Sequence, residues 1–293
     1  MRKPPRLEIK DSDDLFELSS FIDPLLGLKL DHDIYLSQVW IGTSKSESKK
    51  FDDFRKSDWL GKGFYASVYK VYHKPSKKNM AFKQVQFHAN SLSLHQIQTE
   101  FYVLHSSTCP YIIDFYGAFF KDAKVFFCIE LMDASIEALI SNGIPESVLK
   151  LVIISVLRAL NYLKDQLQII HGDVKPGNIL ISKSGTVKIC KSRSLKKGDF
   201  GVSTKLNDES SFKHKLDGSI AYFAPERALV KTTVTTSKSD VFSLGISAIQ
   251  MASGEHPFKN VDSIFALFNA ICLDPIPLNT NVSDDCQMFI SKW

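Results

Sequence analysis

One short segment, residues 171–178, constrains the fold of this chain more than any other part of its sequence. It reads His-Gly-Asp-Val-Lys-Pro-Gly-Asn and places an imidazole, a carboxylate, an ammonium group and a carboxamide within a few residues of one another. A lone Asp or Lys carries little information, because both are common in ordinary surface loops. The complete spacing is far more specific, and the surrounding sequence must supply a matching context.

This segment resembles the catalytic loop of the eukaryotic protein kinases, H-R-D-x-K-x-x-N. Phosphoryl transfer needs a carboxylate that orients the attacking hydroxyl and accepts its proton, and the resemblance gives that role to Asp173. It also implies that Lys175 neutralises charge on the transferring group and that Asn178 is a ligand of Mg²⁺ on the phosphates of ATP. Asp173 and Lys175 are therefore the expected catalytic residues.

An upstream run resembles the kinase glycine-rich loop, G-x-G-x-x-G-x-V, which covers the phosphates of ATP. The run consists of Leu60, Gly61, Lys62, Gly63, Phe64, Tyr65, Ala66, Ser67 and Val68. Glycines let backbone N–H groups approach phosphate oxygens, although Ala66 replaces the third glycine. Taken alone, such a run is more often a plain turn. Residues 69–72 are expected to form the second strand of a hairpin.

A lysine and a glutamate fit the pair that positions ATP in the kinases. Lys83 lies in Met-Ala-Phe-Lys-Gln-Val, which resembles the strand motif V-A-I-K. A lysine in a strand usually points to water. Whether Lys83 does so or instead contacts the phosphates of ATP depends on whether it has an acidic partner. Apolar residues at helical spacing over 94–104 predict a helix that carries Glu100 on or beside its apolar face. A glutamate there needs a cation, and Lys83 is the expected one.

Further motifs follow in the order that the resemblance requires. Asp199 begins an Asp-Phe-Gly run, which makes it the expected second ligand of Mg²⁺. An Ala-Pro-Glu run at 224–226 resembles the end of the activation segment. The run that begins at Ser237 resembles the start of a buried helix, in which Asp240 would bind the backbone of the catalytic loop.

A strand expected over 125–129 leads into a linker at 130–133. By resemblance this linker is the hinge that hydrogen-bonds the adenine of ATP. Glu130 and Met132 are then expected contacts of the nucleotide, and Ile129 is the expected gatekeeper. Ile129 also suits a simple strand core, and the two roles are compatible.

These motifs predict an α+β protein with the two-lobed eukaryotic protein kinase fold, with a small β-rich N-lobe over 54–133 and a larger helical C-lobe over 134–293. Apolar residues at helical spacing over 149–163 predict a long buried helix, and 178–181 and 186–189 predict a hairpin. Residues 1–50 are expected to form a flexible tail with one or two short ordered pieces. The chain stops at Trp293, before the helix in which relatives carry an arginine that pairs with the glutamate of the Ala-Pro-Glu run, here Glu226. We therefore expect a truncated C-terminus and no partner for Glu226.

The resemblance narrows to the MAP kinase kinases, the dual-specificity enzymes that phosphorylate MAP kinases on threonine and tyrosine. It rests on Asp-Val-Lys-Pro at 173–176, Phe-Tyr-Gly-Ala-Phe-Phe at 115–120, Glu-Leu-Met-Asp at 130–133, Asp-Phe-Gly-Val-Ser-Thr at 199–204 and Ala-Pro-Glu-Arg at 224–227. It implies an ATP-dependent kinase of a MAP kinase activation segment in a stress or mitogen signalling cascade. The alternative is a catalytically impaired pseudokinase that acts as a MAP kinase-binding module.

The N-terminus carries a run that resembles the docking motif of the same family, a basic cluster followed by two spaced apolar residues. By resemblance, the residues that contact the MAP kinase are Arg2, Lys3, Arg6, Leu7 and Ile9. An ordinary basic tail is the alternative. An upstream MAP kinase kinase kinase is a further expected partner.

Three features depart from the kinase pattern, and the first two, together with the short C-terminus, favour the pseudokinase alternative. Gly172 replaces an arginine that normally pairs with a phosphate on the activation segment, so one anchor for activation is lost. An insertion at 191–198 precedes Asp199. If it forms a loop that bulges outward, Asp199 can still reach the Mg²⁺ site, and if it does not, metal binding and catalysis fail. A gene-model error is a third alternative. The family carries two Ser or Thr hydroxyls between the Asp-Phe-Gly and Ala-Pro-Glu runs that accept activating phosphates, and a matched pair is absent here. Ser210 or Ser211 is a candidate for the first of them. We therefore expect altered or partly lost regulation.

Composition weighs against several other classes of protein. The formal net charge is +4, and the insertion alone carries four basic residues and no acid, so the charge is local and gives no support to nucleic-acid binding. No apolar stretch reaches membrane-spanning length, and the N-terminus lacks the apolar core of a signal peptide. The five cysteines show no metal-ligand spacing. We therefore expect a cytoplasmic protein, with passage into the nucleus left open, and neither nucleic acid nor membrane as a partner.

Overall fold

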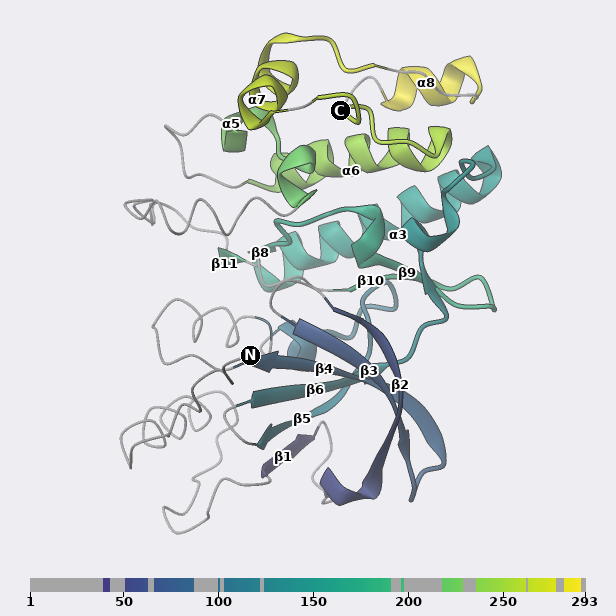
Figure 1. The fold of residues 1–293 in the computed structure, drawn as a ribbon, viewed down its shortest axis with the longest axis vertical. Coiled ribbons are helices and arrows are strands. Elements are labelled where there is room, and N and C mark those ends of the chain that lie inside the picture. The colour runs from purple at the N-terminus through teal and green to yellow at the C-terminus, as the bar shows by residue number, and fades with distance from the viewer. Residues whose placement is uncertain are drawn as a thin grey trace, which may run out of the picture. The chain divides into compact units, whose positions relative to one another are not determined.

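The chain forms two compact units in the computed structural model, one made of residues 1–106 and 114–131 and the other of 107–113 and 132–293. The structure describes residues 39–42, 51–62, 66–86, 100, 103–121, 124–190, 196–197, 218–228, 236–261, 263–277 and 282–290. The first, called here the β-rich unit, is built on one sheet, and the second, the helical unit, is mostly α-helical (Figure 1). The predicted α+β class is confirmed.

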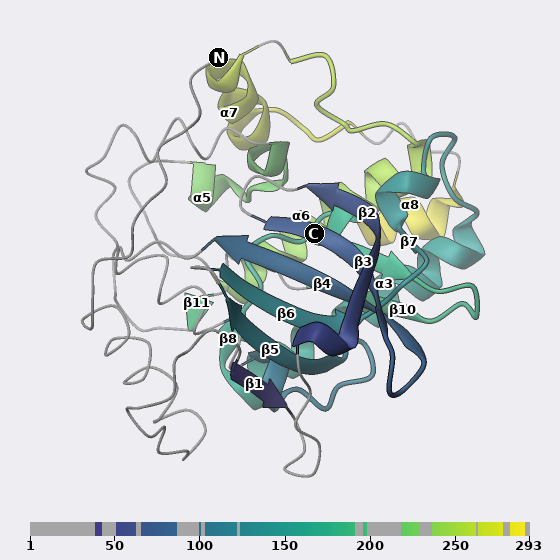
Figure 2. The same ribbon diagram turned by 60° about the horizontal axis from the view of Figure 1, so that its bottom comes forward.

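A six-stranded antiparallel sheet with the order β1-β5-β6-β4-β3-β2 forms the β-rich unit. Its strands are β1 (Val39–Gly42), β2 (Phe54–Lys62), β3 (Ala66–His73), β4 (Lys78–Gln86), β5 (Phe115–Lys121) and β6 (Lys124–Glu130), and a short 3-10 helix, η2 (Phe51–Asp53), precedes β2. Strand β1 lies within the segment expected to be a flexible tail and pairs with β5 at the edge of the sheet (Figure 2). The docking motif at 2–9 lies outside the described residues.

Aromatic side chains form the core on one face of this sheet. The buried residues of the cluster are Val71, Met80, Phe82, Phe119, Phe126 and Cys128, with Phe51 and Phe54 packed against them. The rings of Phe54 and Phe82 have centroids 4.8 Å apart. Because side chains alternate along a strand, Lys83 points to the face opposite Phe82. The aromatic core therefore orients β4 so that its lysine faces away from the cluster.

Two long helices dominate the helical unit, α3 (Glu146–Leu167) and α6 (Ser237–Ser253). The predicted apolar stripe of α3 is buried at Leu149, Val152, Ile153, Val156, Leu160 and Leu163. Helix α6 begins with a capping box, in which Thr236 accepts from the Ser239 N–H while the Ser239 side chain accepts from the Thr236 N–H. It is buried along most of its length, so it serves as a fixed support for the loops around it.

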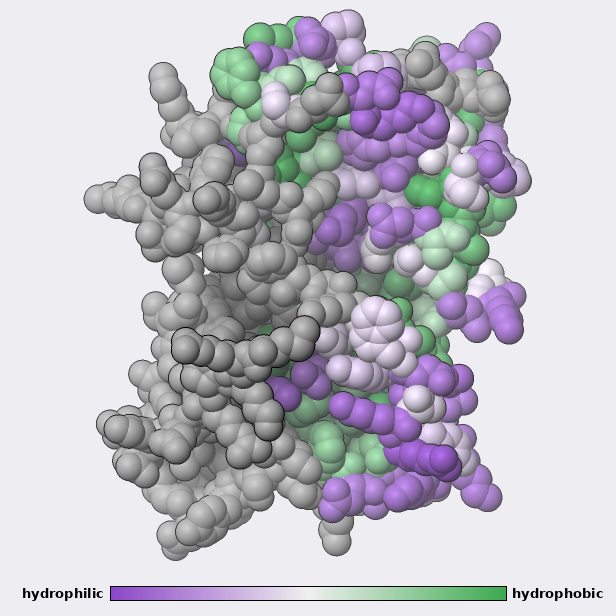
Figure 3. Space-filling view, in the orientation of Figure 1, coloured by the Kyte–Doolittle hydropathy of each residue, from purple (hydrophilic) through white to green (hydrophobic). Residues whose placement is uncertain are grey.

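Short elements complete the helical unit. They are β7 (Ala134–Ser135), η3 (Ile136–Leu139), β8 (Ile169–Ile170), η4 (Pro176–Asn178), β9 (Ile179–Ile181), β10 (Val187–Ile189), β11 (Lys196–Lys197), η5 (Gly218–Tyr222), α5 (Pro225–Ala228), α7 (Ile264–Leu273) and α8 (Asp284–Ile290). Strands β9 and β10 form the predicted hairpin, and β7 pairs with β9. Within the described residues no helix is long and apolar enough to span a membrane. Hydrophilic residues cover much of the described surface on the face in Figure 3.

Candidate active site

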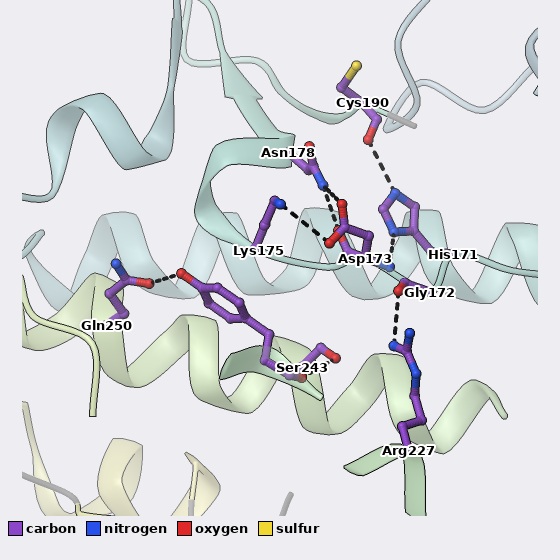
Figure 4. A network of polar contacts seen from close by, with 10 residues as sticks. His171, Gly172, Asp173, Lys175, Asn178, Cys190, Arg227, Ser243 and Gln250 are labelled. Atoms are coloured by element: carbon purple, nitrogen blue, oxygen red, sulfur yellow. Dashed lines mark hydrogen bonds and ion pairs between the residues drawn. The ribbon is translucent and has the colours of Figure 1, made fainter. Parts of the chain in front are cut away.

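The predicted catalytic loop lies between two strands of the helical unit. Strand β8 ends directly before His171, and the loop closes through η4 before β9 begins. Within it the Asn178 side-chain amide donates to the backbone oxygen of Asp173 at 2.7 Å and to its carboxylate Oδ2 at 2.8 Å (Figure 4). The ammonium group of Lys175 lies 3.5 Å from Asp173 Oδ1. The fold therefore brings the three predicted residues of this loop together.

The same contacts show how this loop could hold a divalent cation. Because the Asn178 amide nitrogen donates to Asp173, the amide oxygen is turned away from that residue (Figure 4). Carboxylate and amide oxygens are the ligands that Mg²⁺ prefers in proteins. The other expected ligand, Asp199, lies outside the described residues, and among those described no group of three His, Cys, Asp or Glu side chains gathers as a metal site.

Asp240 on α6 holds the start of the catalytic loop, as the sequence predicted. Its carboxylate accepts from the His171 N–H at 2.8 Å and from the Gly172 N–H at 2.7 Å. The side chain is only 3% exposed. Burial raises the pKa of Asp240, and the His171 imidazole and the two N–H donors act in the opposite direction. These bonds tie the loop to the buried helix.

His171 joins the loop to the segment that follows β10. Its Nε2 lies 3.2 Å from the backbone oxygen of Cys190, and its Nδ1 accepts from the Asp173 N–H at 3.3 Å. An imidazole that accepts at Nδ1 carries its proton at Nε2, so Cys190 is the acceptor. The backbone N–H of Cys190 in turn donates to the backbone carbonyl oxygen of Asn178 at 2.8 Å. Residue 190 is therefore fixed against the catalytic loop.

Part of the insertion pairs with the strand that leads into the loop. Lys196 lies opposite Ile170 and Lys197 opposite Ile169, as antiparallel strands β11 and β8. This differs from a loop that bulges outward over its whole length, because two of its residues add a strand beside the start of the catalytic loop. The rest of the insertion lies outside the described residues.

The predicted ion pair of the β-rich unit is present. Lys83 Nζ lies 2.5 Å from Glu100 Oε1, and the two side chains are 12% and 1% exposed. The second oxygen, Glu100 Oε2, is buried and has no hydrogen-bond partner among the described residues. A buried carboxylate with an open acceptor position suits a site that receives another donor or charged ligand.

The glycine-rich run forms the predicted hairpin. Residues 60–62 belong to β2 and 66–68 to β3, with Gly61 opposite Val68 and Val68 opposite Lys83 on β4. A Cβ atom added to Gly61 would meet no other atom within 4 Å, so there is open space beside its backbone. Gly63, Phe64 and Tyr65, at the tip, lie outside the described residues.

The expected hinge follows β6. Ile129 is buried in this strand, as a strand-core residue would be. The Glu130 N–H donates to the Asp114 oxygen at 2.9 Å, and the Glu130 carboxylate accepts from the Asp114 N–H at 3.3 Å. Met132 is half-buried. The adenine contacts of these residues stay predictions.

The end of the activation segment corrects one expectation. Glu226 was expected to have no partner, but its Oε1 accepts from the Ser239 hydroxyl at 2.6 Å. The capping box at the start of α6 brings this hydroxyl to the carboxylate. Tyr222 donates to Gln250 at 2.6 Å, and burial raises the pKa of this tyrosine. The candidate acceptors Ser210 and Ser211 lie outside the described residues.

Sequence reasoning assigned no role to Arg227. Its Nη1 donates to the Gly172 oxygen at 2.9 Å, and its guanidinium lies 3.8 Å from the centroid of the Phe223 ring. The arginine directly follows the Ala-Pro-Glu run, and nothing in its local spacing signals a contact with residue 172. The contact joins the end of the activation segment to the catalytic loop.

The chain is similar to known protein kinases over most of its length. Residues 54–293 match the family model of the protein kinase domain. The chain is 36% identical over 303 residues to protein kinase wis1 of Schizosaccharomyces pombe, covering 99% of this chain and 48% of that protein. It is 38% identical over 290 residues to MAP kinase kinase PBS2 of Saccharomyces cerevisiae, covering 93% and 42%. It is 36% identical over 244 residues to dual specificity mitogen-activated protein kinase kinase sek-1 of Caenorhabditis elegans, covering 80% and 70%. The chain thus spans less than half the length of the two yeast relatives.

Proposed function

Because the chain belongs to the MAP kinase kinase family of protein kinases, we propose that it transfers the γ-phosphate of ATP to threonine and tyrosine in the activation segment of a MAP kinase. The observation that carries the proposal is the convergence of Asp173, Lys175 and Asn178 in one loop. The setting we propose is a stress or mitogen signalling cascade. The names of the relatives PBS2 and sek-1 support the substrate class.

Asp173 orients the substrate hydroxyl and accepts its proton. The hydroxyl oxygen forms a bond to the γ-phosphorus while the bond to the β-phosphate oxygen breaks, and ADP leaves. Two contacts fix the direction of the carboxylate, because Oδ2 accepts from Asn178 and Oδ1 faces Lys175. Lys175 then neutralises charge on the transferring group, where a preorganised cation needs no reorganisation during the reaction.

The proposed divalent cation is Mg²⁺, held by the side-chain oxygens of Asn178 and Asp199. When bound, it neutralises charge on the phosphates of ATP. Lys83 contacts the α- and β-phosphates, and its ion pair with Glu100 holds the ammonium group in place.

The remaining nucleotide contacts come from the hairpin and the hinge. Backbone N–H groups of residues 60–68 cover the phosphates, and the open space beside Gly61 supports a close approach there. Glu130 and Met132 bind the adenine, and Ile129 lies behind it. The proposed N-lobe over 54–133 carries these nucleotide contacts, and the proposed C-lobe over 134–293 carries the catalytic loop.

The proposed partners are a MAP kinase substrate and an upstream MAP kinase kinase kinase. The N-terminal residues Arg2, Lys3, Arg6, Leu7 and Ile9 dock the substrate through basic and apolar contacts. The proposed location is the cytoplasm. No specific structural observation among the described residues favours the pseudokinase alternative, and the loop retains Asp173, Lys175 and Asn178.

The test is phosphate transfer to a purified MAP kinase whose own lysine for ATP has been replaced, so that it cannot phosphorylate itself. Wild type and Asp173→Ala are assayed side by side, and mass spectrometry maps the modified residues. We expect phosphate on both a threonine and a tyrosine, and a loss of about 10²–10⁴-fold in the variant. Equal signals from the two proteins would assign the activity to a contaminant and support a binding module.

A further inference from the structure

The peptide groups of Gly172 are held from two sides. Its N–H donates to Asp240 Oδ1 at 2.7 Å. Its oxygen accepts from Arg227 Nη1 at 2.9 Å (Figure 4). Its φ is +77°, a left-handed conformation that glycine adopts without a steric cost. Residue 172 is therefore a fixed point between α6 and the end of the activation segment.

Arg227 is itself well fixed. Its guanidinium stacks on the Phe223 ring, with 3.8 Å between the guanidinium carbon and the ring centroid. Burial lowers the pKa of Arg227, whereas the carboxylates of Asp240, Asp173 and Glu226 raise it. An arginine with such neighbours stays charged at neutral pH. Its planar group therefore presents a directed donor to the catalytic loop.

The carbonyl that Arg227 holds belongs to the peptide bond of Asp173. The oxygen of that bond is the Gly172 oxygen, and its hydrogen is on the Asp173 nitrogen, which donates to His171 Nδ1 at 3.3 Å. Because a peptide bond is planar, a partner on its oxygen and another on its hydrogen fix the orientation of the whole plane. The Asp173 Cα is an atom of that plane, so the plane sets where its carboxylate begins.

We propose that Arg227 is a positioning residue for Asp173. It holds the peptide plane between residues 172 and 173. Gly172 has no side chain that could anchor the loop to the activation segment, and Arg227 supplies a guanidinium to the backbone of that residue instead. The inference rests on the proposed function, because it assigns to Asp173 the role of accepting the substrate proton.

The rival explanation is that Arg227 only stabilises the helical unit through its stack and its buried hydrogen bond. The two explanations differ in what they change. A positioning role alters the rate of the chemical step while the affinity for ATP is kept, since a misplacement of about 1 Å can cost about 10²-fold. A stabilising role alters the midpoint of unfolding and leaves the rate per folded molecule unchanged.

The experiment compares Arg227→Met and Arg227→Lys with wild type and with Ser247→Ala. Ser247 is a matched control for stability, because it is buried on α6 and its hydroxyl donates to the Ser243 oxygen at 2.7 Å. For each protein, kcat and KM for ATP are measured on a MAP kinase, together with the unfolding midpoint. Asp173→Ala sets the background.

We expect Arg227→Met to lower kcat by about 10–100-fold with KM for ATP within about twofold. Arg227→Lys keeps the charge without the planar fork, so we expect a kcat about threefold or more below wild type. Ser247→Ala should lower the unfolding midpoint and keep kcat.

Wild-type kcat in either arginine variant would overturn the proposal, and so would an equal loss in Ser247→Ala. If Arg227→Met does not fold, the lysine variant decides alone. A wild type no more active than Asp173→Ala would refute the proposed function and this inference together, whereas an active wild type with unchanged arginine variants refutes the inference alone.

Discussion

The ion pair between Lys83 and Glu100 allows a quantitative test of the β-rich unit. The two charged atoms are 2.5 Å apart, and Glu100 is 1% exposed. At an effective dielectric constant of about 20, unit charges at this separation attract by about 7 kcal/mol. The cost of removing both ions from water offsets most of that attraction, whereas removal of one partner leaves the other buried and uncompensated.

We therefore expect Glu100→Leu and Lys83→Met, made singly, each to lower the free energy of unfolding by about 3–5 kcal/mol. The double variant replaces both ions by apolar side chains of similar size, so its loss should be far smaller than the sum, with a coupling of at least about 2 kcal/mol. Urea unfolding of all four proteins measures the coupling, and titration with ATP reports on the site.

Single losses that add in the double variant to within about 0.5 kcal/mol would contradict the reasoning, because independent sites add in that way. Retained ATP affinity in Lys83→Met would separately contradict the role proposed for the ammonium group.

Three further predictions concern the helical unit, the insertion and the N-terminus. Burial lowers the pKa of His256 from 6.5 to about 4, so between these pH values the unfolded chain binds more protons than the folded one. The free energy of unfolding should therefore be highest above pH 6.5 and fall by up to about 3 kcal/mol as the pH is lowered towards 4. His256→Phe should remove this dependence on pH, and equal slopes in the two proteins would refute the prediction. Deletion of 191–198 joins Asp199 to Cys190, which is already hydrogen-bonded to the catalytic loop, and removes β11, which runs antiparallel to β8 and so away from His171. We expect faster phosphate transfer than in wild type or in a variant with eight Gly and Ser residues at 191–198, and a folded deletion variant with slower transfer would contradict this. Leu7→Ala with Ile9→Ala should weaken capture of a MAP kinase by about 10²-fold or more, since docking would bury two apolar side chains worth about 1.5–3 kcal/mol each, whereas Ser12→Ala should not weaken it. Unchanged affinity would remove the docking proposal.

Local patterns in the sequence predicted much of the fold. The kinase fold predicted from the motifs is confirmed by the match over 54–293. The apolar spacing over 149–163 predicted the buried face of α3, and the contact of Lys83 with Glu100 followed from the cost of burying an unpaired carboxylate. These inferences succeeded because periodicity and charge burial depend on few residues at a time.

Some contacts between distant residues were beyond such reasoning, although the resemblance predicted the bonds from Asp240 to the backbone of the catalytic loop. Ser239 as the partner of Glu226 depends on how a helix cap meets the preceding helix, and the bond from Arg227 to Gly172 joins residues 55 apart. Likewise the pairing of β11 with β8 uses backbone groups, which every residue carries, so its side chains gave no signal. Of the candidate site, Asp199 and residues 63–65 lie outside the described residues, and their roles stay predictions.

The rate of a single turnover tests the central claim most directly, because it isolates the chemical step from product release. Enzyme in excess over a MAP kinase is mixed with ATP and Mg²⁺, and phosphate on the substrate is followed in time for wild type and Asp173→Asn. The amide keeps the shape of the side chain and cannot accept the proton, so we expect the transfer rate to fall by about 10²–10⁴-fold. Equal rates for the two proteins would contradict the assignment of residue 173 as the group that receives the proton.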